Sequence, residues 1–88
     1  MDDHEARLRR LRMRSWRRGT REMDLILGRF ADAEIGTLSE GELAELEQLL
    51  EVPDPDFYAA VTGARPLPPE QTPALFARIK AFRAADAD

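Results

Sequence analysis

Apolar residues recur along this chain at the three-to-four-residue spacing of amphipathic helices, in separate short segments. Proline and glycine residues divide the segments, and no window shows the strict alternation of a half-buried strand. The pattern therefore predicts an all-α fold, a compact five-helix bundle of short helices that forms a single domain over residues 1–88. We expect the terminal residues to fray.

The first two helices are expected on either side of Gly19, over residues 3–18 and 20–31. Glycine suits the left-handed residue that ends many helices, and Thr20 is a good N-cap for the second helix. Gly28 lies inside that helix, where glycine costs roughly 1 kcal/mol relative to alanine, and we expect close packing against a neighbouring helix to compensate. The apolar positions are Leu8, Leu11 and Trp16 in the first helix, and Met23, Ile26, Leu27 and Phe30 in the second.

The third helix is marked at both of its ends. Ser39 and Glu42 have the spacing of a capping box, in which each side chain bonds the backbone amide of the other residue. Pro53 lacks an amide hydrogen and disfavours helical backbone at Val52, so we expect the helix to end there. Its apolar stripe consists of Leu43, Leu46, Leu49 and Leu50.

Two shorter helices are expected in the last third of the chain. Asp54 is predicted to cap the fourth, with Pro55 in its first helical position and Gly63 as its stop. The fifth is expected to start near Pro69 or Pro73. Their apolar residues are Phe57, Tyr58 and Val61 in the fourth helix, and Leu75, Phe76, Ile79 and Phe82 in the fifth.

Composition leaves little room for catalysis. The chain has no cysteine, and its one histidine, His4, lies near a terminus, which excludes thiolate metal sites and histidine-dependent nucleophiles. Neither a phosphate-binding loop nor a dinucleotide fingerprint is present. The carboxylates of Glu42, Glu45 and Glu47 flank a leucine stripe and are expected to form a solvated face. We therefore expect no enzyme and no stably bound cofactor.

Charge is distributed unevenly along the chain. Residues 1–22 carry eight arginines against four acids, a net +4, whereas residues 23–88 carry five basic and thirteen acidic residues, a net −8. Clustered arginine keeps open a regulatory or nucleic-acid-binding module as the alternative function. The sequence pI near 5.0 favours a protein partner over nucleic acid. No apolar run approaches the roughly 20 residues of a membrane-spanning helix, so we expect no membrane insertion.

The junction between the first two predicted helices is the most unusual stretch of the sequence. A structural interpretation explains a glycine that turns the chain and a glutamate in the first turn of the next helix, but gives no reason for so many arginines. A rigid charged corner that docks to a partner explains the arginines as well as the glycine and the glutamate. The candidate partner-binding residues are Arg17, Arg18, Gly19, Arg21, Glu22 and Asp24.

This junction resembles a known family. The segment Arg18-Gly19-Thr20-Arg21-Glu22 matches the R-G-x-x-E motif of the succinate dehydrogenase flavinylation factors, the SdhE or assembly factor 2 family. Leu49-Leu50-Glu51 followed by Asp54-Pro55-Asp56 is similar to a second recurring stretch of that family. The resemblance covers the chain from about Arg7 to Phe82, with one departure, Ala60, where many members have tryptophan.

The resemblance implies a protein that binds the flavoprotein subunit of succinate dehydrogenase, and in some members that of fumarate reductase. Binding would promote the covalent link between a client histidine and the 8α-methyl group of FAD. Arg18, Gly19 and Glu22 would form the functional motif, with Arg17, Arg21 and Asp24 flanking it. We expect Arg18 and Glu22 to point outward, Glu22 towards a client arginine and Arg18 towards a client carboxylate or carbonyl. We also expect a monomer in the bacterial cytoplasm. A direct carrier of free FAD is the third class of function considered.

Overall fold

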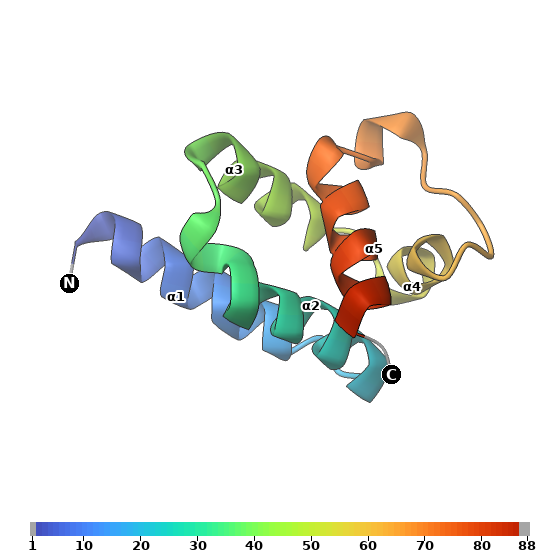
Figure 1. The fold of residues 1–88 in the computed structure, drawn as a ribbon, viewed down its shortest axis with the longest axis horizontal. Coiled ribbons are helices and arrows are strands. Elements are labelled where there is room, and N and C mark those ends of the chain that lie inside the picture. The colour runs from blue at the N-terminus through green and yellow to red at the C-terminus, as the bar shows by residue number, and fades with distance from the viewer. Residues whose placement is uncertain (1, 87–88) are drawn as a thin grey trace.

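Five α-helices and two short 3-10 turns make up residues 2–86, the part of the chain that the computed structural model describes (Figure 1). The predicted all-α, five-helix fold is confirmed. We expected the terminal residues to fray, and three of them, residues 1, 87 and 88, lie outside the described residues. The elements are α1 (Asp3–Trp16), α2 (Arg21–Glu34), η1 (Ile35–Thr37), α3 (Glu40–Leu49), α4 (Asp54–Val61), η2 (Pro69–Gln71) and α5 (Ala74–Asp86).

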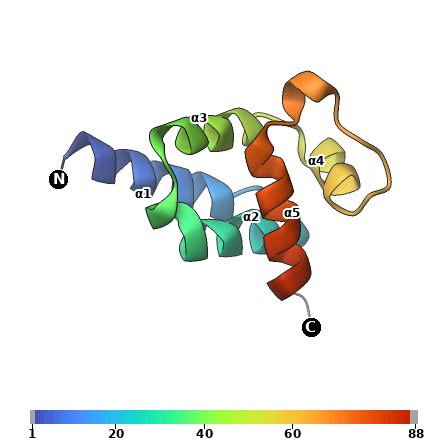
Figure 2. The same ribbon diagram turned by 45° about the horizontal axis from the view of Figure 1, so that its top comes forward.

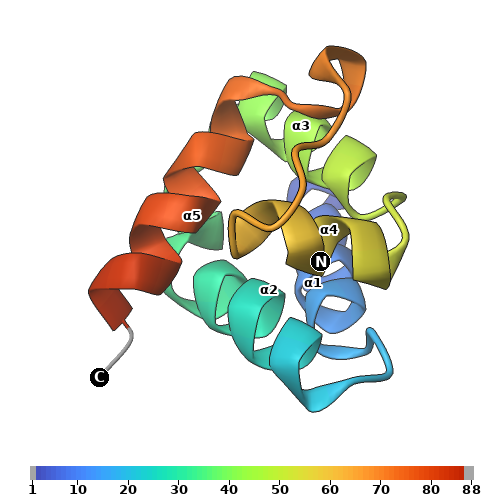
Figure 3. The same cartoon turned by 90° about the vertical axis from the view of Figure 1, so that its right-hand side faces the viewer.

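The helices are arranged around a single core. α1 and α2 pack along each other, and α5 packs against both α2 and α3 (Figures 1 and 2). Figure 3 shows α4 at the end of the bundle, between α2 and α3. All five helices contribute buried apolar side chains, and two edge-to-face ring pairs join distant segments, Phe30 with Phe82 at 5.6 Å and Phe57 with Phe76 at 5.5 Å between ring centroids.

Gly28 packs closely against a side chain of the neighbouring helix α1, as the sequence led us to expect. A β-carbon at this position would lie 2.2 Å from Cδ2 of the Trp16 indole, far inside van der Waals contact. The indole therefore occupies the space that glycine leaves open, and its Nε1–H donates to Asp32 at 3.1 Å.

Among residues 2–86, no helix is long and apolar enough to cross a membrane.

Several helix ends differ from the prediction. α2 continues to Glu34, past the expected end at Ala31, because no glycine or proline interrupts the chain before Gly36. α1 ends at Trp16 and α3 at Leu49, and the residues after α3 form tight turn bonds such as Val52 N–H to the Leu49 carbonyl at 3.1 Å. α5 begins just after Pro73, whereas Pro69 opens the separate turn η2.

The predicted cap of α4 is wrong. Pro53 occupies the N-cap position, so Asp54 is the first helical residue and Pro55 the second, and no side chain caps this helix. The Asp54 carboxylate instead accepts hydrogen bonds from Arg18, which lies at the junction of α1 and α2.

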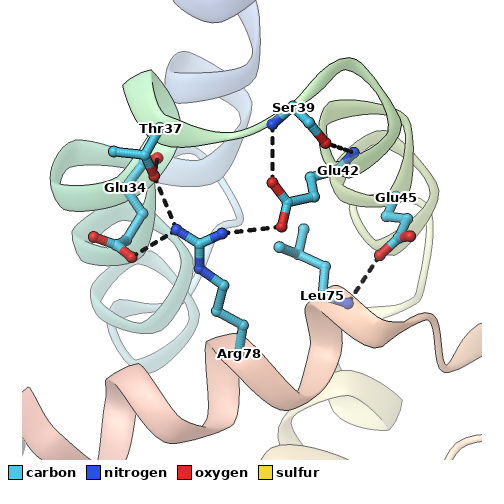
Figure 4. Close-up of polar contacts among 7 residues, drawn as sticks. All are labelled: Glu34, Thr37, Ser39, Glu42, Glu45, Leu75 and Arg78. Carbon is cyan, nitrogen blue, oxygen red and sulfur yellow. Dashed lines mark hydrogen bonds and ion pairs between the residues drawn. The ribbon is translucent and has the colours of Figure 1, made fainter.

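The carboxylates of α3 hold the bundle together, which corrects the expectation of a merely solvated face. The capping box is confirmed, with Ser39 N–H to Glu42 Oε1 at 2.9 Å and Glu42 N–H to Ser39 Oγ at 3.1 Å (Figure 4). Glu42 also accepts from Arg78 of α5 at 3.0 Å, while Glu45 accepts from the Leu75 amide at 2.8 Å (Figure 4). The third carboxylate, Glu47, pairs with Arg7 of α1 at 2.8 Å.

These contacts favour the ionised forms of the groups involved. The Ser39 amide, and after it Arg78, holds the pKa of Glu42 below its ordinary value. The hydrogen bond from Arg7 likewise lowers the pKa of Glu47. Arg78 donates to Glu34 at 2.9 Å and to Thr37 at 2.8 Å as well, and the bond to Glu34 raises the pKa of its guanidinium (Figure 4). A single arginine thus joins α5 to the end of α2 and the start of α3.

Candidate functional site: a charged corner between α1 and α2

The corner is built on Gly19, whose φ of +98° lies in the left-handed region. Residues with a β-carbon rarely adopt this conformation, whereas glycine does so without strain. A β-carbon added at Gly19 would meet no atom within 4 Å, so the backbone conformation, and not lack of space, demands glycine. The next residue, Thr20, is the N-cap of α2, and its Oγ1 accepts from the Met23 amide at 3.3 Å. The sharp turn and the helix start are therefore fixed locally.

Arg18 does not point outward, and the expectation that it does is wrong. Its side chain is only 14% exposed, and its guanidinium reaches under the chain that joins α3 to α4. There it donates to the carbonyl oxygens of Leu50 at 2.7 Å and Val52 at 3.0 Å. It also pairs with Asp54, at 2.7 Å from Nη2 and 2.9 Å from Nε. Arg18 thus satisfies carbonyls that the end of α3 leaves without a helical partner.

Asp24 supports the corner from the other side. This half-buried residue lies in the first turn of α2, and its Oδ1 accepts a 2.8 Å hydrogen bond from the Arg18 backbone amide. A carboxylate in the first turn of a helix is also stabilised by the positive end of the helix dipole. Arg18 and Asp24 therefore hold the corner in place, with one side chain reaching to α4 and the other back to the turn.

Three of the predicted partner-binding residues do face solvent. Arg17, Arg21 and Glu22 are exposed, and none has a hydrogen-bond or ion-pair partner within residues 2–86. Arg18 does not pair with Glu22, because its guanidinium pairs with Asp54. The structure divides the six predicted residues into an inward pair, an outward trio and the glycine between them.

Glu22 stands between two shallow grooves that share one further residue, Tyr58. One groove lies towards α4 and the other towards the end of α5. Tyr58 is 39% exposed, one of the two large hydrophobic side chains that are exposed among residues 2–86. The sequence pattern predicts Tyr58 only as part of the apolar surface of its helix, and its place beside Glu22 becomes evident only in the fold. The first groove is lined by Thr20, Glu22, Met23, Asp54, Pro55 and Tyr58.

The remaining sequence-based candidates lie away from the corner. His4 is half exposed and lies 3.4 Å from Glu40, which agrees with a residue of the bundle surface. Ala60, the position at which the sequence was expected to depart from its family, is buried at 4% exposure and belongs to the core, not to the corner. Over residues 2–86, no group of histidine, aspartate and glutamate side chains is placed to hold a metal ion.

Fold and site together define a small all-helical domain whose distinctive feature is an exposed charged corner, held in place by the largely buried side chain of Arg18. The model of the family described as "Flavinator of succinate dehydrogenase" matches residues 9–83, which include the whole corner. The chain belongs to this family, and the predicted family membership is confirmed.

Individual relatives agree with the family match. The chain is 38% identical over 78 residues to the FAD assembly factor SdhE of Acetobacter pasteurianus. This alignment covers 89% of this chain and 72% of that protein. It is 39% identical over 64 residues to the mitochondrial succinate dehydrogenase assembly factor 2 of Mycosarcoma maydis, or 73% of this chain but only 27% of that longer protein. A Legionella pneumophila FAD assembly factor SdhE is 43% identical over 47 residues, 53% of this chain and 60% of that protein. No solved structure gave a significant match.

Proposed function

We propose that this chain is a FAD assembly factor that binds the flavoprotein subunit of succinate dehydrogenase and promotes the covalent attachment of FAD to a histidine of that subunit. The observation that carries the proposal is the family match over residues 9–83. It spans the glycine turn, the exposed glutamate and the Asp54 contact that fixes the turn. The relatives named as FAD assembly factors support the same function.

In this proposal the chemistry belongs to the client. The 8α carbon would lose a proton and form a bond to a nitrogen of the client histidine, whose imidazole would lose a second proton, and the two electrons would pass into the flavin ring and then to an external oxidant. The assembly factor contributes geometry, because the rate of such a step depends steeply on the placement of the reacting atoms. The chain itself is then not an enzyme, holds no FAD stably and acts as a monomer.

Glu22 is the residue that we expect to contact the client most directly. Its carboxylate is exposed and has no partner within residues 2–86, and the aromatic ring of Tyr58 borders the same grooves. A guanidinium of the client can pair with the carboxylate and lie over the ring, which are the two interactions that arginine favours. Gly19 keeps the backbone beside it free of a side chain. Arg18 contributes by holding this surface in position.

The test is a flavinylation assay with purified apo-flavoprotein, FAD and limiting assembly factor. We expect Glu22→Gln to bind the flavoprotein roughly tenfold more weakly and to lose most of the covalent flavin fluorescence in denaturing gels. Glu70→Gln is the matched control, because Glu70 is also exposed and lies on η2, across the molecule from the start of α2 (Figures 1 and 3).

Different outcomes separate the possibilities. Normal flavinylation with Glu22→Gln removes this side chain from the mechanism, and failure of the wild-type chain to bind or flavinylate the subunit refutes the proposed function. Tight binding of free FAD in a titration would instead indicate a carrier. The same assay with a fumarate reductase flavoprotein tests the second proposed client.

A further inference from the structure

The solvent-facing side of α1 carries a second charged surface, which meets the corner at Arg17 and Arg18. Only Leu11 and Ser15 of this helix are buried. On the other side, a shallow groove is lined by Arg10, Met13, Arg14, Arg17 and Arg18. We call this groove the α1 groove. Met13 is 45% exposed, the more exposed of the two large hydrophobic side chains that face solvent among residues 2–86.

Most arginines of α1 are already neutralised by the chain's own acids. Arg7 pairs with Glu40 and Glu47, Arg12 with Asp32, and Arg14 with Glu51. Arg10 and Arg17 differ, because neither has a hydrogen-bond or ion-pair partner within residues 2–86, and both are exposed. The cations of the α1 groove that make no direct contact with an acid therefore lie at its two ends, and Arg10 is close enough to Glu47 to help lower the pKa of that carboxyl.

The spacing of these charges sets a geometric requirement. Arg10 lies in α1 and Arg17 directly follows the last residue of that helix, seven positions further along, so the two are about 10 Å apart along the axis. Met13 lies between them on the same face, since it follows Arg10 by three residues and precedes Arg17 by four. A complementary surface presents two carboxylates about 10 Å apart with an apolar side chain between them.

We propose that the α1 groove is a second docking surface, and that it takes an acidic segment of the flavoprotein with an apolar residue between two carboxylates. A helix with acids at positions i and i+7 has this spacing. The inference rests on the proposed function for the identity of the partner. The α1 groove is basic whereas Glu22 is acidic, so a client that contacts both surfaces fits in one orientation only.

A protein segment explains the α1 groove better than a polyphosphate chain does. Nucleic acids present one phosphate after another and reward a continuous row of free cations. The cations beside this groove are interrupted by carboxylates, because Arg14 is bound to Glu51, whose side chain is 75% exposed. An exposed methionine between two arginines adds an apolar contact that a phosphate backbone does not use.

The test measures association with the purified flavoprotein subunit at several salt concentrations. We expect Arg10→Glu to raise the dissociation constant about threefold to tenfold, mainly through slower association, and to weaken the salt dependence. Lys80→Glu is the control with the same charge change, because Lys80 is exposed on α5, a helix that packs on α2 and α3 (Figure 3). We expect it to alter binding by less than about twofold.

The outcomes distinguish this inference from the function on which it rests. If Glu22→Gln weakens binding but Arg10→Glu behaves like Lys80→Glu, the second surface is refuted and the assembly-factor function stands. If the wild-type chain does not bind the flavoprotein, both fail. Salt-sensitive binding of duplex DNA or of phosphatidylglycerol vesicles that is lost with Arg10→Glu, without an effect on the flavoprotein, would assign the groove to phosphate groups and overturn the proposal.

Discussion

Replacing Arg18 by methionine tests whether the arginine of the motif acts within the fold. Methionine keeps most of the length and the apolar stem but removes every donor. The carbonyls of Leu50 and Val52 then lose their bonds from Nη1 and Nη2, and Asp54 loses its cation. Because the Asp54 side chain is only 19% exposed, water replaces that cation incompletely.

The size of the effect follows from the number and type of the lost bonds. A hydrogen bond to a charged group contributes about 1.5–3 kcal/mol, and breaking a fully buried ion pair costs about 3–5 kcal/mol. Arg18 is 14% exposed and its bonds share one guanidinium, so the contributions do not simply add. We expect Arg18→Met to lower the free energy of unfolding by about 2–4 kcal/mol. For a domain of this size the melting temperature falls by about 10–25 °C.

Urea unfolding followed by far-ultraviolet circular dichroism measures the change, and Asp54→Asn completes a double-mutant cycle. Since the two side chains touch, we expect a coupling free energy of about 1 kcal/mol or more. In flavinylation assays below the melting temperature of both variants, Asp54→Asn is expected to reduce activity alongside Arg18→Met. Unchanged stability of Arg18→Met, or lost activity of Arg18→Met while Asp54→Asn stays fully active, would refute the bracing role and assign Arg18 to the client.

Two further predictions concern the bundle. Gly28→Ala places a β-carbon 2.2 Å from the Trp16 indole and is expected to destabilise by about 1–3 kcal/mol in urea titrations, whereas in a Trp16→Ala background it stabilises by up to about 1 kcal/mol through helix propensity. Because the folded-state pKa of Glu42 is lowered, its contribution to stability is present above its unfolded pKa of about 4.5 and is lost as the pH falls through the folded value. Glu42→Gln should therefore flatten the acid limb of the stability profile, and an unchanged limb would contradict this reasoning.

Features of the chain that depend on neighbouring residues could be predicted from the sequence. The capping box of Ser39 and Glu42 requires only two side chains and the first turn of a helix, and it forms as expected. The left-handed stop at Gly19 is equally local. Gly28 was informative because a glycine inside an otherwise apolar helix needs a reason, and close packing of the helices supplies one.

Features that depend on distant segments could not be predicted in the same way. Arg17 and Arg18 are adjacent and chemically identical, yet one is exposed and the other is nearly buried. The difference arises because the turn after α3 brings the carbonyls of Leu50 and Val52 to one of them and not to the other. Asp54 likewise takes part in this distant contact as the partner of Arg18, whereas the local pattern predicted it as a helix cap.

This division changes how the R-G-x-x-E segment is interpreted. Its arginine makes its contacts with α4 and the turn before it, and its glycine permits the left-handed backbone. Of the three fixed residues of the motif, the glutamate is the one whose side chain projects into solvent from the first turn of α2. A partner that docks at the corner therefore meets Glu22 and Tyr58 directly but detects Arg18 only through their positions. Substitutions at Arg18 and Glu22 then differ in kind, because the first changes stability together with docking, whereas the second changes docking at constant stability.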